Sequence, residues 1–218
     1  MESVVLYTFV GLALIVAICW HYIRQKKLRE AWSAWANSNG WSYHPEKNKR
    51  RAKTYSFLNR LNQGHSRYLY HRIEGEHSGR KAEAFTFHYA VGHGKHRSDH
   101  FFGVVLIKLE QDFPEIRIHP ENFFHKVGGL VGIKDLDLDS IEFSKTFRIL
   151  SKDKKFAFDF CNTGMMEFLL QKKTTALELE RDTLAIFRKG HLEPNRMKSA
   201  LRLLDGIRNH MPQYLFQE

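Results

Sequence analysis

Cysteine and proline are scarce in this sequence, and their scarcity restricts the fold. The chain has 218 residues and 2 cysteines, of which Cys19 lies in an apolar run and Cys161 stands alone in the remainder. A disulfide within the remainder is therefore excluded, which suits a reducing compartment. The 5 prolines form no proline-rich linker, and no internal repeat divides the chain. We therefore expect one domain after the apolar run.

Motifs of known catalytic and cofactor sites are also missing. The segment Gly92-His93-Gly94 lacks the third glycine of a dinucleotide-binding loop, and the glycines at 128, 129 and 132 lack the Lys-Ser/Thr pair of a phosphate-binding loop. No Gly-x-Ser-x-Gly sequence is present, and Cys161 lies in a phenylalanine-rich segment where inert packing is expected. We predict no catalytic residue and no cofactor.

Acidic residues are fewer than basic ones, with 24 Asp and Glu against 34 Lys and Arg, for a formal net charge of +10. The first 23 residues contain Glu2 as their single charged group, so the basic excess belongs to the rest of the chain. A basic surface attracts anionic lipid head groups, an acidic protein surface or nucleic acid. These three are the partner classes that the composition admits.

One long uncharged run stands at the beginning. Val4–Ile23 reads VVLYTFVGLALIVAICWHYI, about the 20 residues that a helix needs to cross a bilayer. Tyr7 near one end and Trp20 near the other suit the two membrane interfaces. The run predicts a transmembrane anchor over residues 1–25, with a basic flank at the membrane surface formed by Arg24, Lys26, Lys27 and Arg29.

The charge asymmetry around this run predicts its orientation. The amino-terminal flank has no Lys or Arg, and the flank with the positive charges stays in the cytoplasm. A cleavable secretory signal is disfavoured because its positive n-region and small-residue cleavage site are missing. A buried helix of a globular domain is disfavoured because such helices are shorter and amphipathic. We therefore expect a single-pass protein of the bacterial inner (plasma) membrane, with its amino terminus outside and its domain in the cytoplasm.

A helix is predicted to continue from the anchor over residues 26–40. Its apolar stripe recurs at helical spacing and consists of Leu28, Ala31, Trp32, Trp35 and Ala36. Gly40 follows Asn39 and is a suitable residue to end the helix. We expect the stripe to pack on the domain. The basic stretch from Lys47 to Lys53 then predicts an exposed loop.

Hydrophobic periodicity predicts one α+β domain over residues 41–218. Between Arg67 and Leu109, alternating residues around the turn at His77–Arg80 predict an antiparallel β-meander, and Phe101–Leu109 is apolar enough for a central strand. A shorter strand, Glu115–His119, follows Pro114. The remaining elements are strands at 41–44, 136–143 and 146–150, helices at 154–161, 164–170 and 194–210, and a hairpin of 175–179 with 183–187 about Glu180-Arg181-Asp182.

Histidines in the segment HYAVGHGKHRSDH are the candidates for a metal site. His93, His96 and His100 lie near His88 and Asp99 at spacings that zinc or nickel ligands can have. No cysteine assists them, and the cations Lys95 and Arg97 stand among them, so we predict no metal there. Asp135, Asp137 and Asp139 imitate the start of a calcium loop, but Ser140 replaces the required glycine and Thr146 the required glutamate.

Several segments together carry a resemblance to a known family. The uncharged span and basic flank are followed by a helix that ends in Asn-Gly-Trp, and then by FRILSKDKKFAFDF, MMEFLL and LRLLDGIRNHMPQYLF. In this order the chain resembles an uncharacterised family of bacterial single-span membrane proteins, whose cytoplasmic domain is of unknown function. Membership would imply an inner-membrane protein and would transfer no catalytic residues.

These observations favour a membrane-anchored cytoplasmic binding or scaffold module. Its basic surface would face anionic lipid head groups or a partner, such as a membrane protein, while its oligomeric state stays open. One alternative is an enzyme with a dispersed active site, which a buried polar pocket would support. Another is a membrane-tethered nucleic-acid binder, which would need basic and aromatic residues together on one face. Nucleic acid is not the partner that we expect.

Overall fold

The computed structural model describes residues 2–120, 134–135, 140–172 and 175–216. Over these residues seven strands form one antiparallel sheet in the order β1-β2-β3-β4-β6-β5, and β7 pairs with β4. The strands are β1 (Ser42–His44), β2 (His65–His77), β3 (Arg80–Val91), β4 (Ser98–Pro120), β5 (Lys134–Asp135), β6 (Phe147–Ser151) and β7 (Ala176–Lys189). The predicted α+β class with an antiparallel sheet and flanking helices is confirmed.

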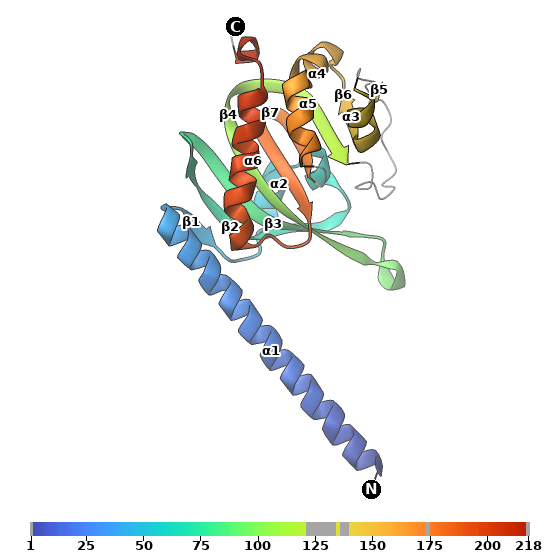
Figure 1. Cartoon of the computed structure of the whole chain (residues 1–218). Coiled ribbons are helices and arrows are strands. Elements are labelled where there is room, and N and C mark those ends of the chain that lie inside the picture. Colours follow the sequence, from blue (N-terminus) through green and yellow to red (C-terminus); the bar gives the residue numbers. More distant parts are fainter. Residues whose placement is uncertain (1, 121–133, 136–139, 173–174, 217–218) are drawn as a thin grey trace.

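The helices cover both faces of this sheet (Figure 1). They are α1 (Glu2–Asn39), α2 (Lys49–Thr54), α3 (Ile141–Thr146), α4 (Lys154–Phe160), α5 (Thr163–Leu170) and α6 (Met197–His210). Short 3-10 helices are η1 (Asn59–Asn62), η2 (Gly94–His96), η4 (Pro194–Arg196) and η5 (Gln213–Phe216). The predicted carboxy-terminal helix is therefore present, with Leu204 and Ile207 on its buried side.

Alternation along β3 divides the core into two clusters. Phe85 and Phe87 pack with Tyr55 and Leu58, which lie at the end of α2 and just after it. On the other face Ala84 belongs to the cluster that includes α4, α5 and α6. The sequence predicted one buried face for β3, but residues 82–90 are all buried, because helices pack against both sides of the strand.

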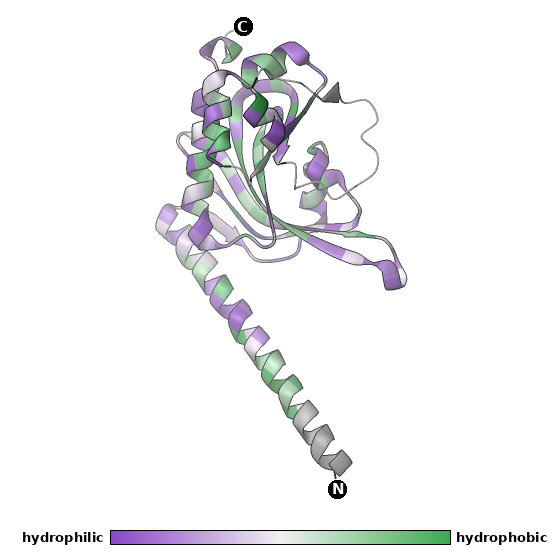
Figure 2. Cartoon of the chain, turned by 45° about the vertical axis from the view of Figure 1, so that its right-hand side comes forward, coloured by the Kyte–Doolittle hydropathy of each residue, from purple (hydrophilic) through white to green (hydrophobic). Residues whose placement is uncertain are grey.

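The first helix corrects the prediction of a membrane anchor. Considering only the residues that the structure describes, no helix combines the length and apolar character that a membrane crossing requires. Within Gly11–Asn39 the uncharged run ends at Ile23, and Arg24 follows it directly. Figure 2 shows the same change, from an apolar part of α1 to a hydrophilic part. The predicted transmembrane helix, single-pass topology and bacterial inner-membrane location are therefore wrong.

The last turns of α1 belong to the domain core. Trp32 and Ala36 are fully buried there. Trp35 makes edge-to-face contacts with Trp32 and Trp41, at ring-centroid distances of 6.5 Å and 5.3 Å. The helix ends before Gly40, whose φ of 69° is in the left-handed region that glycine adopts without strain. The predicted apolar stripe thus joins α1 to the sheet.

Three predicted strands are parts of longer ones. Glu115–His119 continues β4 through Pro114, and the expected hairpin at 175–187 is the single strand β7. Arg181 takes a positive φ of 54° where β7 pairs with Phe113, and the register shifts on both sides of that pair. The polar residues 180–182 therefore form an irregularity within a strand and not a turn, because β4 supplies a partner over the full length of β7.

Two local segments also differ from expectation. The predicted loop at 47–53 contains α2, because the Asn48 side chain caps the helix by accepting a hydrogen bond from the Arg51 backbone N–H at 2.7 Å. The predicted strand at 136–143 overlaps α3, which Ser140 caps through the Phe143 backbone N–H at 3.3 Å. The glycines at 128–132 and the aspartates at 137 and 139 lie outside the described residues.

Candidate functional site

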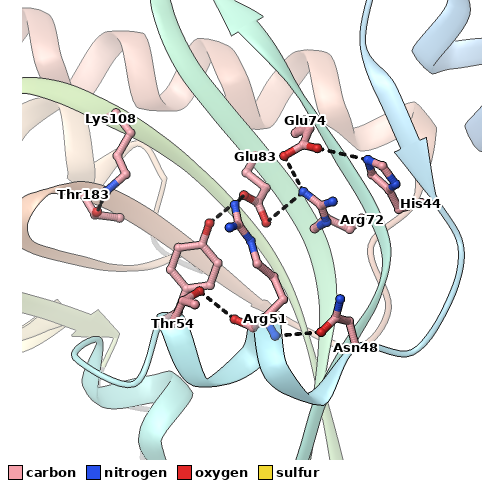
Figure 3. Close-up of polar contacts among 10 residues, drawn as sticks. His44, Asn48, Arg51, Thr54, Arg72, Glu74, Glu83, Lys108 and Thr183 are labelled. Carbon is pink, nitrogen blue, oxygen red and sulfur yellow. Dashed lines mark hydrogen bonds and ion pairs between the residues drawn. The ribbon is translucent and has the colours of Figure 1, made fainter.

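A pocket lies where α2 crosses the sheet near β1. Its volume is about 550 Å³, and residues from β1, β2, β3, β4 and α2 line it. The ionisable side chains among them are Arg51, Tyr55, Glu74, Lys81, Glu83 and Lys108. We call it the Arg51–Glu83 pocket. Figure 3 shows how side chains from α2 and three neighbouring strands meet there.

Glu83 is the buried carboxylate of this pocket, with 5% of its surface exposed. Its Oε2 accepts hydrogen bonds from Arg51 Nη2 at 2.7 Å and from the Tyr55 hydroxyl at 2.6 Å. Its Oε1 is buried and has no hydrogen-bond partner among the described residues, since Arg72 Nη1 stands 3.8 Å away. At that distance Arg72 forms an ion pair with Oε1 but no hydrogen bond.

Arg51 and Tyr55 reach Glu83 together because Tyr55, the C-cap residue of α2, lies about one helical turn beyond Arg51. The hydrogen bond with Glu83 raises the pKa of Arg51, and burial together with the Glu83 charge raises the pKa of the Tyr55 hydroxyl. Both side chains therefore keep their protons when Glu83 is ionised. Arg51 Nε is itself buried without a hydrogen-bond partner in the described structure.

Two carboxylates face each other across β2 and β3, because Glu74 pairs in register with Glu83. Such a pair is unfavourable unless cations separate it. Arg72 supplies the separation by forming an ion pair with Glu74, and His44 Nε2 lies 3.0 Å from the other Glu74 oxygen. Burial would raise the pKa of Glu74, but the hydrogen bonds from Arg72 and His44 outweigh it and lower that pKa.

Two lysines line the pocket beside Glu83. Lys108 Nζ lies 2.5 Å from Asp182 Oδ1 and 2.8 Å from Thr183 Oγ1. Lys81 is exposed and makes no ion pair with any described residue. With Asp182 included, the three cations Arg51, Lys81 and Lys108 are balanced by three carboxylates. The arrangement suits the binding of a polar ligand.

The predicted metal candidates do not converge. His93 stacks on His65 at 4.5 Å, His100 stacks on Tyr89 at 5.0 Å, and His96 ends η2. Within the described parts of the chain, no group of three or more His, Cys, Asp or Glu side chains could hold a metal ion.

His88 and Cys161 also have structural roles. His88 is buried, and its Nε2 lies 2.7 Å from Asp99 Oδ1. Burial raises the pKa of the Cys161 thiol to about 12, consistent with inert packing.

The basic flank of α1 lies outside the pocket. Arg24 lies over the Trp20 ring at 5.6 Å, and Lys26 pairs with Glu30 at 4.0 Å on the exposed helix. Lys27 and Arg29 are exposed as well. None of the four lines the Arg51–Glu83 pocket. Their predicted contact with a membrane surface depended on the anchor and is not carried further.

Sequence reasoning missed the two residues that organise the pocket. Arg51 was one of five basic residues in a predicted loop, and Glu83 was one polar residue within a predicted strand. A signal for Arg51 did exist, because Asn48 is a suitable helix cap and Arg51 and Tyr55 have helical spacing. No local signal identifies Glu83, since its partners come from segments that precede it by about 30 positions.

A second buried polar cluster lies at the other end of β4. Glu178 of β7 pairs in register with Arg117 of β4, and only 2% of Glu178 is exposed. Both carboxylate oxygens accept from the Arg60 backbone N–H, at 3.1 Å and 3.2 Å, and Glu115 pairs with Arg117 at 2.7 Å. Burial raises the pKa of Glu178 to about 7. The hydrogen bonds between Glu178 and the Arg60 backbone hold η1 against the sheet.

Comparisons with known proteins place the fold. No protein-family model matches the chain, and no curated protein sequence matches it. Among solved structures, the chain is similar to the crystal structure of the mycobacterial trehalose monomycolate transport factor A, TtfA, with a TM-score of 0.64 and 12% sequence identity. The match covers 85% of this chain and 96% of that one. The chain therefore has a fold like that of TtfA.

Proposed function

We infer that this chain is a binding module whose ligand occupies the Arg51–Glu83 pocket. The observation that carries this proposal is the pocket of about 550 Å³ itself, where the exposed Lys81 lies beside Arg51 and the two carboxylates Glu74 and Glu83. The correction to α1 removes the membrane anchor from the sequence prediction. Binding is the part of that prediction that we retain.

The energetic argument starts from the cost of burying Glu83. Removing a carboxylate from water costs several kcal/mol, and this cost is offset only if ion pairs and hydrogen bonds satisfy the group. Arg51 and Tyr55 satisfy one oxygen of Glu83. The Arg72 guanidinium, 3.8 Å from the second oxygen, adds an ion pair on that side. Glu83 therefore holds the pocket wall together, and the groups of the pocket that stay exposed, such as Lys81, are the ones that can contact a ligand.

The structural neighbour supports the same proposal. TtfA is described as a transport factor, a role that does not itself require catalysis. The pocket side chains agree with this role. They form ionised pairs, which hold and orient a ligand, and Arg51 and Tyr55 have raised pKa values that disfavour proton transfer at neutral pH.

Fragment binding to the full chain tests this proposal. Ser42 is exposed and lines the pocket, so Ser42→Trp should fill it with an indole ring. Lys198→Trp places the same ring on the exposed side of α6 and is the matched control. Saturation-transfer NMR with a library of small polar fragments should show binders for the wild type and the control. These signals should disappear in Ser42→Trp. Full binding by Ser42→Trp, or no binder for the wild type, would refute the proposal.

A further inference from the structure

We propose that the chain binds single-stranded nucleic acid on a surface beside α1, separate from the Arg51–Glu83 pocket. The surface combines rings that are at least partly exposed with exposed cations around them. We call the rings of Tyr68, Tyr70, Phe101 and His191 the aromatic surface. None of these residues lines the pocket, so the inference is independent of the proposed function.

The register of the sheet places the rings of the aromatic surface side by side. Tyr68 of β2 pairs with His88 of β3, which pairs with Phe101 of β4, so the three side chains lie on one face of the sheet. The buried His88 stacks on Tyr68 at 4.3 Å, and its ring centroid is 5.0 Å from that of Phe101. His191 stacks on Phe101 at 4.6 Å, and its Nδ1 lies 2.6 Å from the Tyr70 hydroxyl. His191 is exposed, so a base can stack at this end of the series.

Two cations flank the aromatic surface at Tyr68. Lys47 Nζ lies over the Tyr68 ring at 4.8 Å. Arg97, in the turn between β3 and β4, has its Nη2 2.7 Å from Asp99 Oδ1, and His88 Nε2 lies 2.7 Å from the same oxygen. Asp99 thus holds an arginine beside the stacked rings.

The basic flank of α1 lies on the other side of the aromatic surface. Burial and the Arg24 charge lower the pKa of His191, so Arg24 is close enough to repel a proton on that ring. Burial and the Arg29 charge likewise lower the pKa of His71 to about 4, and the His71 ring is 5.1 Å from that of Tyr70. Figures 1 and 2 show α1 and the hairpin of β3 and β4 extending from the same end of the domain.

The combination of cations and rings favours single-stranded nucleic acid over other polyanions. The exposed cations that make no ion pair with a described acidic residue are Arg24, Arg29, Lys47 and Lys95. Such cations neutralise phosphates, and aromatic side chains stack on unpaired bases. An anionic lipid surface or an acidic peptide supplies the charge without a base beside each phosphate. The sequence did not predict this partner, because the residues come from distant segments of the chain.

Fluorescence anisotropy with the full chain tests this inference. The probes are labelled oligothymidylate and oligouridylate of about 12 nucleotides, within the site size of single-strand binding domains. An abasic oligonucleotide of the same length carries the same phosphates without bases. At least one of the two probes should bind about tenfold more tightly than the abasic strand, because stacking adds to the attraction of the phosphates, and raising the salt should weaken binding.

Three results would refute the proposal. One is equal binding of the two probes and the abasic strand, and another is no binding of either probe at low salt. The third is binding to vesicles that contain phosphatidylglycerol without binding to either probe, which would identify the surface as a lipid-binding one.

A pair of charge reversals assigns the binding of phosphates to this surface. Arg24→Glu combined with Lys47→Glu should weaken the base-containing and abasic strands alike, by about tenfold or more. Lys152→Glu combined with Lys154→Glu changes the net charge equally, but these exposed residues lie at and just before α4, at the opposite end of the domain (Figure 1). This control should bind as the wild type does. Equal losses in the two double variants would contradict the assignment.

A ring variant assigns the preference for bases. His191→Ala changes an exposed side chain and should remove most of the tenfold advantage over the abasic strand, while the abasic strand binds as before. Tyr214→Ala removes another exposed ring, in η5, and should keep the full advantage. Circular dichroism checks that both variants are folded. An advantage that His191→Ala leaves intact would show that the aromatic surface does not bind bases.

Discussion

Replacing Glu178 by glutamine should change how the stability of the chain depends on pH. The carboxyl group is buried between β4 and β7, and burial raises its pKa from the ordinary value of 4.5 to about 7. The protonated form is therefore favoured in the folded chain. Its contribution to stability is fully present below pH 4.5 and is lost as the pH rises through about 7. Glutamine stays neutral at every pH and has no such contribution to lose.

The size of the effect follows from the shift. A pKa difference of about 2.5 units corresponds to about 3 kcal/mol of folding free energy, because each unit contributes about 1.4 kcal/mol. The stability of the wild type relative to Glu178→Gln should therefore fall by up to about 3 kcal/mol between pH 4.5 and pH 8. His71 and His119 act oppositely, because burial lowers their pKa values to about 4 and about 3 and acid therefore destabilises the folded chain. Both proteins share these histidines, so their effect cancels in the difference.

Urea unfolding at pH 4.5, 6, 7 and 8 measures this difference directly. The wild type and Glu178→Gln are followed by circular dichroism, and the free energies of unfolding are subtracted at each pH. A difference that stays constant within about 0.5 kcal/mol, or that rises with pH, would show that Glu178 is not a buried carboxyl with a raised pKa.

Two further predictions concern packing and the histidine loop. Gly206→Ala should destabilise the chain by about 1–3 kcal/mol in a thermal unfolding assay, because a Cβ there would lie 2.2 Å from the Phe168 ring. In the same assay the control Gly164→Ala should be neutral or stabilising, because its Cβ would meet only contacts of 3.4 Å. Replacing His93 and His96 together by alanine should change stability by less than about 1 kcal/mol, and a larger loss that chelator reproduces in the wild type would reveal a metal site.

Local patterns in the sequence predicted the elements that fold from their own periodicity. Phe85 and Phe87 alternate with small residues, and this alternation identifies β3 without knowledge of its partners. The buried positions of α6, such as Leu204 and Ile207, have helical spacing and are equally readable. These elements account for the α+β class and for the antiparallel arrangement.

Features that depend on distant partners could not be predicted in the same way. The polar residues 180–182 resemble a turn, but β7 continues through them because β4 is long enough to pair on both sides of Arg181. The candidate site also depends on contacts between residues that are far apart in the sequence. Glu83 becomes a buried acceptor only because α2 brings Arg51 and Tyr55 to it from a separate part of the chain.

A crystal structure of the full chain with a bound fragment tests the central claim most directly. Crystals soaked with the tightest-binding polar fragment should show it in the Arg51–Glu83 pocket, in contact with at least one of Arg51, Lys81 and Lys108. A fragment bound elsewhere on the chain, with the pocket empty, would contradict the account.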